Sequence, residues 1–470
     1  MSETIEQRNP RTGESDGPLA VADQAQVAAA AQRLRQAQPA WAGLGVEARC
    51  ARLAQFARAI EEQREPLLQA LLADTGRWHE SVIEVDGVLD SLRRWVADAP
   101  GLLPEGEERG DGLVRTRQRW VPYQLVGVIS PWNFPLLLSL IDAVPALAAG
   151  CAVLVKPSEV TSRFVAALQP AIDAVPELAG VLAFVTGDGR TGQAVIEVVD
   201  TLCFTGSVKT GRKVGEACAA RFIPASLELG GKDPAIVLSD ADIPRAARSL
   251  AWGSFVNGGQ SCMSIERVYV ERPVAQAFID ALAAEAGRLK LAHPDPKDGQ
   301  IGPVISGAQA QIIEEQLADA YAKGARALTG GQIVRMGGDW CPPTVLVDVD
   351  HGMKIATEET FGSVLPVMVV EDEEEAVAKA NDSQYGLSAA VFSGDPQRAQ
   401  RIASRLHAGG VSINDAALTG MVQTAEKQSF KLSGLGGSRM GGASIRRFVR
   451  AQALLINTGE ESPWWFPRAQ

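Results

Sequence analysis

One cysteine stands among neighbours that are unsuited to a hydrophobic core. Cys262 lies in NGGQSCMSIE (257–266), directly after two glycines, a glutamine and a serine. A catalytic thiol needs a lowered pKa or a nearby base, and the oxyanion that it generates needs preorganised donors. Most lone buried cysteines are inert, but this flank predicts a loop with exposed backbone N–H groups. Cys262 is therefore a candidate nucleophile.

Two further side chains could complete such chemistry. Glu228 lies in SLELGGKDP (226–234), an apolar stretch that leads into a glycine pair, and it could act as a general base. Asn133 lies in SPWNFP (130–135), a rigid turn where its amide could serve as a catalytic donor or form an Asx turn. Most glutamates are solvated surface residues, and no Cys–His or Ser–His–Asp set has a telling spacing. The residues alone leave both roles open.

Two glycine-rich turns could bind a phosphate. FTGSVKTG (204–211) follows an expected strand and opens an expected helix, where backbone N–H groups and the helix N-terminus favour negative charge. Its GxxxxG spacing resembles a P-loop, but Arg212 and Lys213 follow where Lys-Ser/Thr is required. TGDGRTG (186–192) contains an isolated GxGxxG, which is equally compatible with a plain turn. Their position at successive strand ends favours a ligand-binding role over a plain turn.

The composition disfavours several classes of partner. The chain has 470 residues, 46% hydrophobic and 21% charged, as in a soluble globular protein, with a net charge of −11 and a pI near 5.1. This acidity disfavours nucleic acid and anionic membranes as partners. The most apolar run (134–155) contains Asp142, two prolines and a glycine, whereas a membrane span needs about 20 uninterrupted apolar residues. We expect neither nucleic acid nor a membrane as a partner.

Cysteine and histidine usage predicts a reduced compartment and no metal. The N-terminal segment is polar and shows no signal peptide, so we expect a cytoplasmic protein with reduced thiols. No histidine or cysteine pair has zinc-ligand spacing. The residues concerned are Cys50, Cys151, Cys203, Cys218, Cys262, Cys341, His79, His293, His351 and His407.

Hydrophobic patterning predicts two α/β units that would position these side chains. Helical spacing covers about 23–75, and short apolar runs (QLVGVIS, CAVLVK, VLAFVTG, TLCFTG, PAIVL) then alternate with helical stretches. Such runs indicate parallel strands covered on both faces. A second series starts near residue 231 with ERVYVE, TVLVDV, VLPVMVV and AAVFSGD. The segments GLVRTRQRWVPYQ and RRFVRAQALLIN read as solvent-facing edge strands, which invite pairing with another subunit.

Taken together, several motifs resemble the aldehyde dehydrogenase superfamily. They occur in the order of that family, over nearly the whole chain: PWNFP (131–135), KPSE (156–159), FTGS (204–207), LELGGKDP (227–234), GQSC (259–262), EETFG (358–362), NDSQYGLSAAVF (381–392) and IND (413–415). The resemblance implies an atypical Rossmann-type cofactor domain, an α/β catalytic domain and a small β flap for oligomerisation. The implied bounds are 1–111 and 125–230 for the NAD-binding domain, 231–444 for the catalytic domain, 112–124 and 445–462 for the flap, and 463–470 for a C-terminal tail.

The resemblance also implies an activity. Cys262 would attack an aldehyde carbon, and the side-chain amide of Asn133 and the backbone N–H of Cys262 would hold the oxyanion. Hydride transfer to the nicotinamide would leave a thioester, which water activated by Glu228 would hydrolyse to the carboxylic acid. A CoA-acylating dehydrogenase, a thiol hydrolase or acyltransferase, and a non-catalytic NAD-binding homologue are the alternatives.

The same resemblance implies a nicotinamide cofactor site. Lys156 and Glu159 match positions that hold the adenosine ribose, and an acidic residue there favours NAD over NADP, although NADP is the alternative. The other implied cofactor-binding residues are Trp132, Gly206, Ser207, Gly211, Leu229, Glu359 and Phe361. The implied assembly is a homodimer or homotetramer.

The substrate expectation rests on the residues that would line the aldehyde channel. These are Phe134, Leu137, Leu138, Ile141, Val256, Ser261 and Met263, none of them cationic. Burying a substrate carboxylate without a cation is costly, which favours an uncharged apolar or aromatic aldehyde. The region KQSFKLSGLGGSR (427–439) departs from the family pattern PFGGxKxSGxGR, and the 416–430 segment could still supply a cation. The aromatic ending SPWWFPRAQ is predicted to dock on its own or a neighbouring subunit, or to cap a partner's substrate tunnel.

Overall fold

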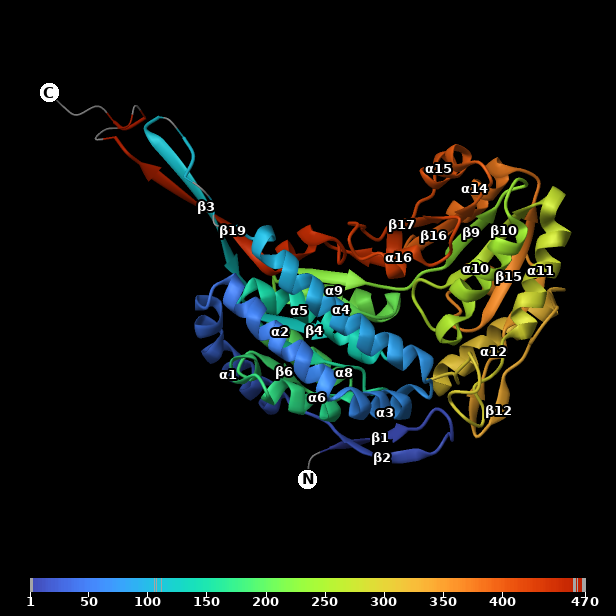
Figure 1. The fold of residues 1–470 in the computed structure, drawn as a ribbon, viewed down its shortest axis with the longest axis horizontal. Helices are drawn as coiled ribbons and strands as arrows, with labels where there is room; N and C mark the ends of the chain where they lie inside the picture. The colour runs from blue at the N-terminus through green and yellow to red at the C-terminus, as the bar shows by residue number, and fades with distance from the viewer. Residues whose placement is uncertain are drawn as a thin grey trace.

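Two lobes, each built on a mainly parallel sheet, make up the body of the molecule, and a long arm leaves the first lobe (Figure 1). The computed structural model describes residues 3–104, 106, 108–110, 112–459, 462 and 464–466. The predicted α/β class is confirmed.

The first lobe contains a six-stranded sheet in which five strands are parallel and the edge strand β18 (Gly434–Leu435) is antiparallel. The strand order is β18, β8 (Ala225–Glu228), β7 (Thr201–Thr205), β4 (Leu125–Ile129), β5 (Ala152–Lys156) and β6 (Leu182–Phe184). Every residue of β4, β5 and β7 is buried, because helices cover both faces. The helices are α1 (Gln24–Gly43), α2 (Val46–Glu62), α3 (Arg64–Thr75), α4 (His79–Leu102), α5 (Pro135–Ala149), α6 (Phe164–Asp173), α7 (Pro176–Ala179), α8 (Gly189–Val198) and α9 (Val208–Ala220).

The second lobe contains a seven-stranded sheet that starts where the sequence pattern changes. Its order is β11 (Arg326–Ala327), β14 (Thr344–Val347), β15 (Val364–Val370), β10 (Ile265–Glu271), β9 (Asp233–Val237), β16 (Ser388–Phe392) and β17 (Gly410–Ile413). Its helices are α10 (Ile243–Phe255), α11 (Ala275–Arg288), α12 (Gly307–Ala322), α13 (Lys354–Thr357), α14 (Glu373–Asn381), α15 (Pro396–Ala403) and α16 (Leu418–Met421). Single 3₁₀ turns are η1 (Val256–Gly259), η2 (Arg272–Val274), η3 (Lys431–Ser433) and η4 (Gly442–Phe448).

The arm is a two-stranded antiparallel ribbon made of β3 (Val114–Pro122) and β19 (Val449–Asn457). It projects well away from the body (Figure 1). Both segments were predicted as edge strands outside the two cores. Two further hairpins are formed by β1 (Thr4–Arg8) with β2 (Ser15–Ala20), and by β12 (Val334–Met336) with β13 (Gly338–Trp340).

The two large sheets can be placed against the predicted domain bounds, which remain a prediction. The change from β8 to β9 falls at the predicted boundary near residue 230. However, β18, which lies inside the predicted range 231–444, pairs with β8 in the sheet of the first lobe. The chain therefore crosses back to the cofactor side before it enters the arm. This crossing carries the 427–439 region past the junction of the lobes.

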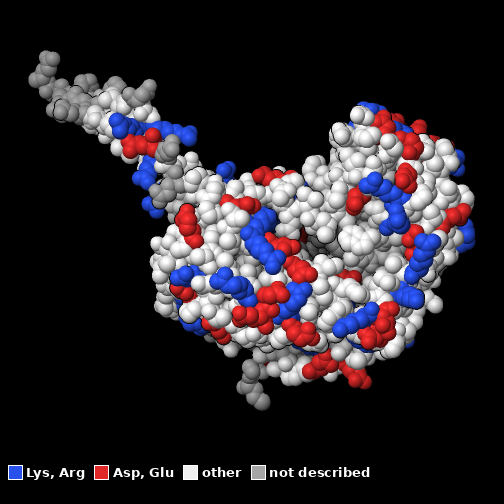
Figure 2. Space-filling view, in the orientation of Figure 1, with Lys and Arg blue, Asp and Glu red and all other residues white. Residues whose placement is uncertain are grey.

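The charged side chains and the most apolar run of the sequence can both be located in the structure. Figure 2 shows acidic and basic side chains interspersed over one face, which is hollowed between the lobes. The run 134–155 forms α5 and β5, which are buried in the core of the first lobe. In the part of the chain that the structure describes, no helix has the length and hydropathy needed to cross a membrane.

Candidate active site

A cavity of about 220 Å³ brings the three predicted catalytic side chains together. Asn133 follows β4 at the start of α5, Glu228 ends β8, and Cys262 lies between η1 and β10. The three therefore come from both lobes, and Cys262, Glu228 and Asn133 all line this one cavity. No group of three or more potential metal ligands occurs among the described residues.

The loop before Cys262 has a backbone that favours glycine. Asn257, Gly258 and Gly259 all have left-handed conformations, with φ of 58°, 62° and 71°. A side chain at Gly259 would place its Cβ 2.2 Å from the carbonyl oxygen of Gly362. The glycine pair in NGGQSC is thus required by both backbone conformation and close packing.

Buried polar contacts hold this loop in place. The Gln260 side chain donates to the carbonyls of Asn257 (2.9 Å) and Pro303 (3.2 Å), and its oxygen accepts from the N–H of Ile305 (2.8 Å). The N–H of Asn257 donates to Glu80 on α4 (3.0 Å). Because these partners belong to separate segments, the position of Cys262 is fixed by tertiary contacts.

Asn133 is buried and points its amide toward the same loop. Its Nδ2 donates to the carbonyl of Gln260 at 2.9 Å, which leaves the second N–H of the amide for another acceptor. Its own carbonyl accepts from Arg77 (2.5 Å) and from Asn257 (3.2 Å). The backbone N–H of Cys262 has no acceptor among the described residues. Two N–H donors are therefore available where an oxyanion would form.

The Cys262 thiol is half-buried and faces acidic neighbours. Burial raises the pKa of this thiol to about 12, and the acidic side chains of Glu228, Glu359 and Asp233 act in the same direction when they are ionised. The ammonium group of Lys427 opposes the shift. In the protein without ligands the thiol is thus protonated at neutral pH.

Glu228 stands at the junction of the cavity and the glycine-rich turn. Its backbone carbonyl accepts from the N–H of Gly206 (3.1 Å), and its Oε2 accepts from the hydroxyl of Ser429 (3.2 Å). Ser429 lies in the region that departs from the family pattern. The Glu228 carboxylate can therefore hold a water molecule in the cavity that contains Cys262.

The predicted adenosine-side residues lie at the C-terminal ends of the parallel strands. Lys156 ends β5 and forms an ion pair with Glu159 at 3.0 Å. Gly206 and Ser207 follow β7, and the Ser207 hydroxyl caps α9 by accepting from the N–H of Thr210. A helix N-terminus at a strand end is the usual place for a nucleotide phosphate.

Close packing explains the second glycine of the FTGSVKTG motif. A Cβ at Gly211 would lie 2.4 Å from Cδ2 of Leu229, so only glycine lets α9 approach the end of β8 so closely. Gly211 and Leu229 are thus neighbours in space, although their contact is apolar. The second predicted phosphate motif, TGDGRTG, lies between β6 and α8, with Asp188 capping the helix.

The predicted nicotinamide-side residues reach this region from the second lobe. The Trp132 and Phe361 rings make an edge-to-face contact with centroids 5.3 Å apart. Glu359 accepts from the N–H of Gly231 (3.1 Å). Burial, together with nearby Glu266, raises the pKa of Glu359 to about 8. A carboxyl group that keeps its proton at neutral pH can both donate and accept, which suits a sugar hydroxyl.

A buried ion pair supports this segment. Lys232 pairs with Glu266 at 2.7 Å, and Glu266 accepts from the N–H groups of Thr360 and Phe361, each at 2.8 Å. Phe361 has a left-handed backbone, with φ of 52°. The Glu266 carboxylate therefore holds Phe361 in an unfavourable conformation against Trp132.

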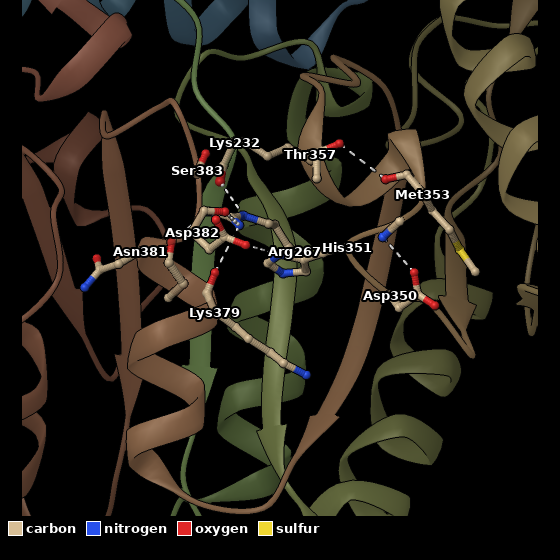
Figure 3. Close-up of polar contacts among 12 residues, drawn as sticks. Lys232, Arg267, Asp350, His351, Met353, Thr357, Lys379, Asn381, Asp382 and Ser383 are labelled. Atoms are coloured by element: carbon tan, nitrogen blue, oxygen red, sulfur yellow. Dashed lines mark hydrogen bonds and ion pairs between the residues drawn. The ribbon is translucent and has the colours of Figure 1, made fainter.

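Behind this pair, Arg267 ties β10 to the end of α14 (Figure 3). Its guanidinium donates to the carbonyls of Lys232 (2.8 Å) and Ala380 (2.9 Å). His351 contacts Asp382 beside the same helix end, at 2.9 Å. The ammonium of Lys431 donates to the carbonyls of Asn381 (2.7 Å) and Ser383 (2.8 Å) at the same helix end. One polar cluster thus anchors both the Glu359–Phe361 segment and the 427–439 region.

All seven predicted channel residues line the cavity, but they do not complete it. Ile83, Trp252 and Met421 also line it and are exposed, so they form its rim. Lys427 and Arg439 line it as well. The seven predicted residues carry no cation, but the 416–430 segment, which was expected to be able to supply one, contributes Lys427. Only the departure of this region from the family pattern signalled it in the sequence.

The two cations differ in their partners. Arg439 pairs with Asp142 at 2.8 Å, and Arg447 pairs with the same carboxylate at 2.9 Å. Burial alone would raise the pKa of Asp142, but the two guanidinium groups hold it below its usual value. Lys427 has a different contact, since its Nζ lies 3.2 Å from the sulfur of Met263.

The sequence and fold identify the class of protein. The model of the aldehyde dehydrogenase family matches residues 1–454, and this chain belongs to that family. The family recognised from the motifs is confirmed.

Individual relatives span almost the whole chain. Glutarate-semialdehyde dehydrogenase of Pseudomonas putida is 34% identical over 467 residues, covering 97% of this chain and 95% of that protein. The solved structure of PutA from Anabaena variabilis has a TM-score of 0.97 at 52% identity, with 99% and 100% of the two chains covered. Betaine aldehyde dehydrogenase of Staphylococcus aureus, solved with NAD+, has a TM-score of 0.91 at 30% identity, with 99% and 93% covered.

Proposed function

We propose that this protein oxidises an aldehyde to its carboxylic acid by covalent catalysis at Cys262. The observation that carries the proposal is the meeting of Cys262, Glu228 and Asn133 at one cavity, next to segments suited to a nicotinamide cofactor. The sulfur of Cys262 attacks the carbonyl carbon and forms a thiohemiacetal. The amide of Asn133 and the backbone N–H of Cys262 hold the oxygen.

A bound nicotinamide cofactor would supply the hydride acceptor, so that oxidation of the thiohemiacetal carbon would leave a thioester on Cys262. Lys156 and Glu159 would hold its adenosine ribose, Gly206 and Ser207 its diphosphate, and Glu359 its second ribose. The Glu159 carboxylate disfavours a 2′-phosphate by repulsion, but its ion pair with Lys156 offsets part of that charge, so we propose NAD with NADP as the alternative.

Glu228 completes the reaction by taking a proton from water, whose oxygen attacks the thioester. The acid leaves and the thiol of Cys262 is restored. A nearby base for water favours hydrolysis over transfer of the acyl group to CoA.

The names of the relatives say less about the charge and shape of the substrate than the cavity does. One relative is named for glutarate semialdehyde, which is an anion, and another for betaine aldehyde, which is a cation. Apolar side chains form most of the wall, which supports a hydrocarbon skeleton. However, an uncharged aldehyde was favoured only because no cation was expected in the channel. Lys427 lines the cavity, so a charged substrate is no longer disfavoured.

The test is NADH or NADPH formation at 340 nm with aliphatic, aromatic and acidic aldehydes, using the whole protein and the Cys262→Ala variant. We expect activity that disappears in the variant and that does not need CoA. Acid formation only with CoA would favour the acylating alternative, and cofactor binding without turnover of any aldehyde would favour a non-catalytic role.

The role of Glu228 is tested by Glu228→Gln. We expect steady-state kcat to fall by about 10²–10⁴-fold while a burst of reduced cofactor remains, because the thioester forms but is hydrolysed slowly. Mass spectrometry after quenching should detect the acylated Cys262. Loss of the burst together with the steady rate would contradict a role confined to hydrolysis.

A further inference from the structure

Four charged side chains line the catalytic cavity, and three of them have evident partners or roles. Glu80 accepts from the N–H of Asn257, Arg439 pairs with Asp142, and Glu228 accepts from Ser429 in a position suited to activating water. Lys427 is the fourth. Its Nζ contacts a thioether sulfur, and no carboxylate among the described residues lies within ion-pair distance.

The backbone that carries Lys427 is firmly held. The N–H of Lys427 donates to the hydroxyl of Ser438 (3.0 Å), and the N–H of Phe430 donates to the carbonyl of Gly386 (2.8 Å). Lys431 closes the segment through its two carbonyl contacts near the end of α14. The stem of Lys427 packs beside Gly410, where an added Cβ would lie 3.3 Å from its Cδ. Its ammonium is therefore positioned by the fold.

This ammonium lies beside the reacting group. Met263, whose sulfur it contacts at 3.2 Å, directly follows Cys262, and Lys427 acts on the pKa of the Cys262 thiol. It also faces the buried carboxyl group of Asp233, which lies behind the Cys262 backbone and accepts from the N–H of Ser388 (3.2 Å). A thioether is a weak acceptor, so a half-buried ammonium keeps most of its hydrogen-bonding capacity for a ligand.

We propose that Lys427 determines substrate specificity by binding an anionic group, such as a carboxylate, at the far end of a short aliphatic aldehyde. The inference rests on the proposed oxidation at Cys262 and names the substrate class for that site. The proximity of Lys427 to Cys262 places the anion only a few bonds from the carbonyl carbon. The apolar wall contacts the methylene groups, and the paired Arg439 is not needed for recognition.

The test compares matched aldehydes: 4-oxobutanoate with butanal, and 5-oxopentanoate with pentanal. For each pair, the ratio of kcat/KM for the anionic aldehyde to that for the neutral one is measured in the original protein, Lys427→Met, Lys427→Arg and the control Lys290→Met. Lys290 is exposed after α11 and is not part of the cavity. We expect Lys427→Met to lower the ratio about tenfold or more, and Lys427→Arg to retain most of it.

A ratio that stays the same in Lys427→Met would overturn the proposal. An equal loss with both members of a pair would also overturn it, since Lys427 would then act on the thiol and not on the substrate. A ratio below one in the original protein would have the same consequence.

Binding without turnover separates this proposal from the proposed oxidation. Glutarate is titrated calorimetrically into the Cys262→Ala protein with and without Lys427→Met. Binding that is lost with Lys427→Met supports the anion site even if no aldehyde is oxidised. Equal binding by both proteins, or binding by neither, overturns the anion site and leaves the oxidation to its own test.

Discussion

Cys262 is the one cysteine of six that is not buried, and it is also the one that lines the catalytic cavity. The other five lie in the cores, where burial makes a thiol inert. At the residue scale, chemistry at Cys262 is thus controlled by its immediate surroundings. Acidic neighbours and burial keep the thiol protonated, whereas Lys427 favours the thiolate.

Alkylation should therefore be selective for Cys262 and strongly dependent on pH. Since burial raises the pKa of this thiol to about 12, the thiolate fraction rises about tenfold per pH unit between pH 7 and 9. We expect the iodoacetamide inactivation rate of the ligand-free protein to rise in the same proportion. Peptide mass spectrometry should locate the label at residue 262, and Cys262→Ser should remain unlabelled. A rate that is flat over this range would mean a thiol that is already ionised.

At the element scale, the turn η1 and the loop after it decide where the thiol stands. Three successive left-handed residues reverse the chain between α10 and β10. The Gln260 side chain then ties the reversal to Pro303 and Ile305, and Glu80 ties it to α4. Two further hydrogen bonds join the loop to Asn133, so that five tertiary hydrogen bonds hold it. Its geometry is therefore sensitive to any added atom.

Gly259→Ala should be destabilising and inactivating. The new Cβ would meet the carbonyl of Gly362 at 2.2 Å on a backbone with φ of 71°. We expect the free energy of unfolding to fall by more than about 1 kcal/mol. We also expect kcat/KM to fall by a factor that corresponds to a larger free energy than this. The matched control is Gly287→Ala, at an exposed helical site with open space around it. We expect this change to raise the free energy of unfolding by roughly 0.5–1 kcal/mol. Denaturant unfolding measures the stability of each variant, and the aldehyde assay measures its kcat/KM. Equal stability of the two variants would contradict this account.

At the scale of the whole molecule, the arm is the element that the single chain does not explain. Leu454, Leu455 and Ile456 of β19 are exposed, with Leu455 71% exposed. Of the predicted tail 463–470, the structure describes Trp464–Phe466, which are also exposed, and its other residues lie outside the described part. A lone two-stranded ribbon with exposed apolar side chains is unstable on its own. We therefore expect a second copy of the chain to bury these side chains.

Leu455→Lys should therefore weaken self-association. We propose that the protein is a homodimer or homotetramer joined through the arm, and a buried charge there would oppose assembly. Light scattering coupled to size exclusion is expected to show a smaller species for Leu455→Lys. Leu328→Lys, a comparable change on the body of the molecule, serves as the control. An identical mass for all three proteins would argue against an arm-mediated assembly.

The sequence by itself determined the class of fold and the family, and it predicted which residues carry the chemistry. Alternating apolar runs dictate parallel strands, and β4, β5, β7, β9 and β10 lie where those runs occur. Cys262, Glu228 and Asn133 could be recognised because each is embedded in a motif whose glycines or prolines constrain the backbone. Such local constraints act through neighbours in the chain and are therefore visible in it.

Only the tertiary structure decided which residues share the cavity and how they are charged. Lys427 is 165 positions from Cys262, and its contact with Met263 depends on the crossing of the chain through β18 and on the anchoring of Lys431. Likewise, the pairing of Arg439 with Asp142 spans 297 positions. Contacts of this kind arise from packing between elements, so no local pattern reports them. The proposed preference for an anionic aldehyde rests on such a contact, which is why the motifs of the sequence did not predict it.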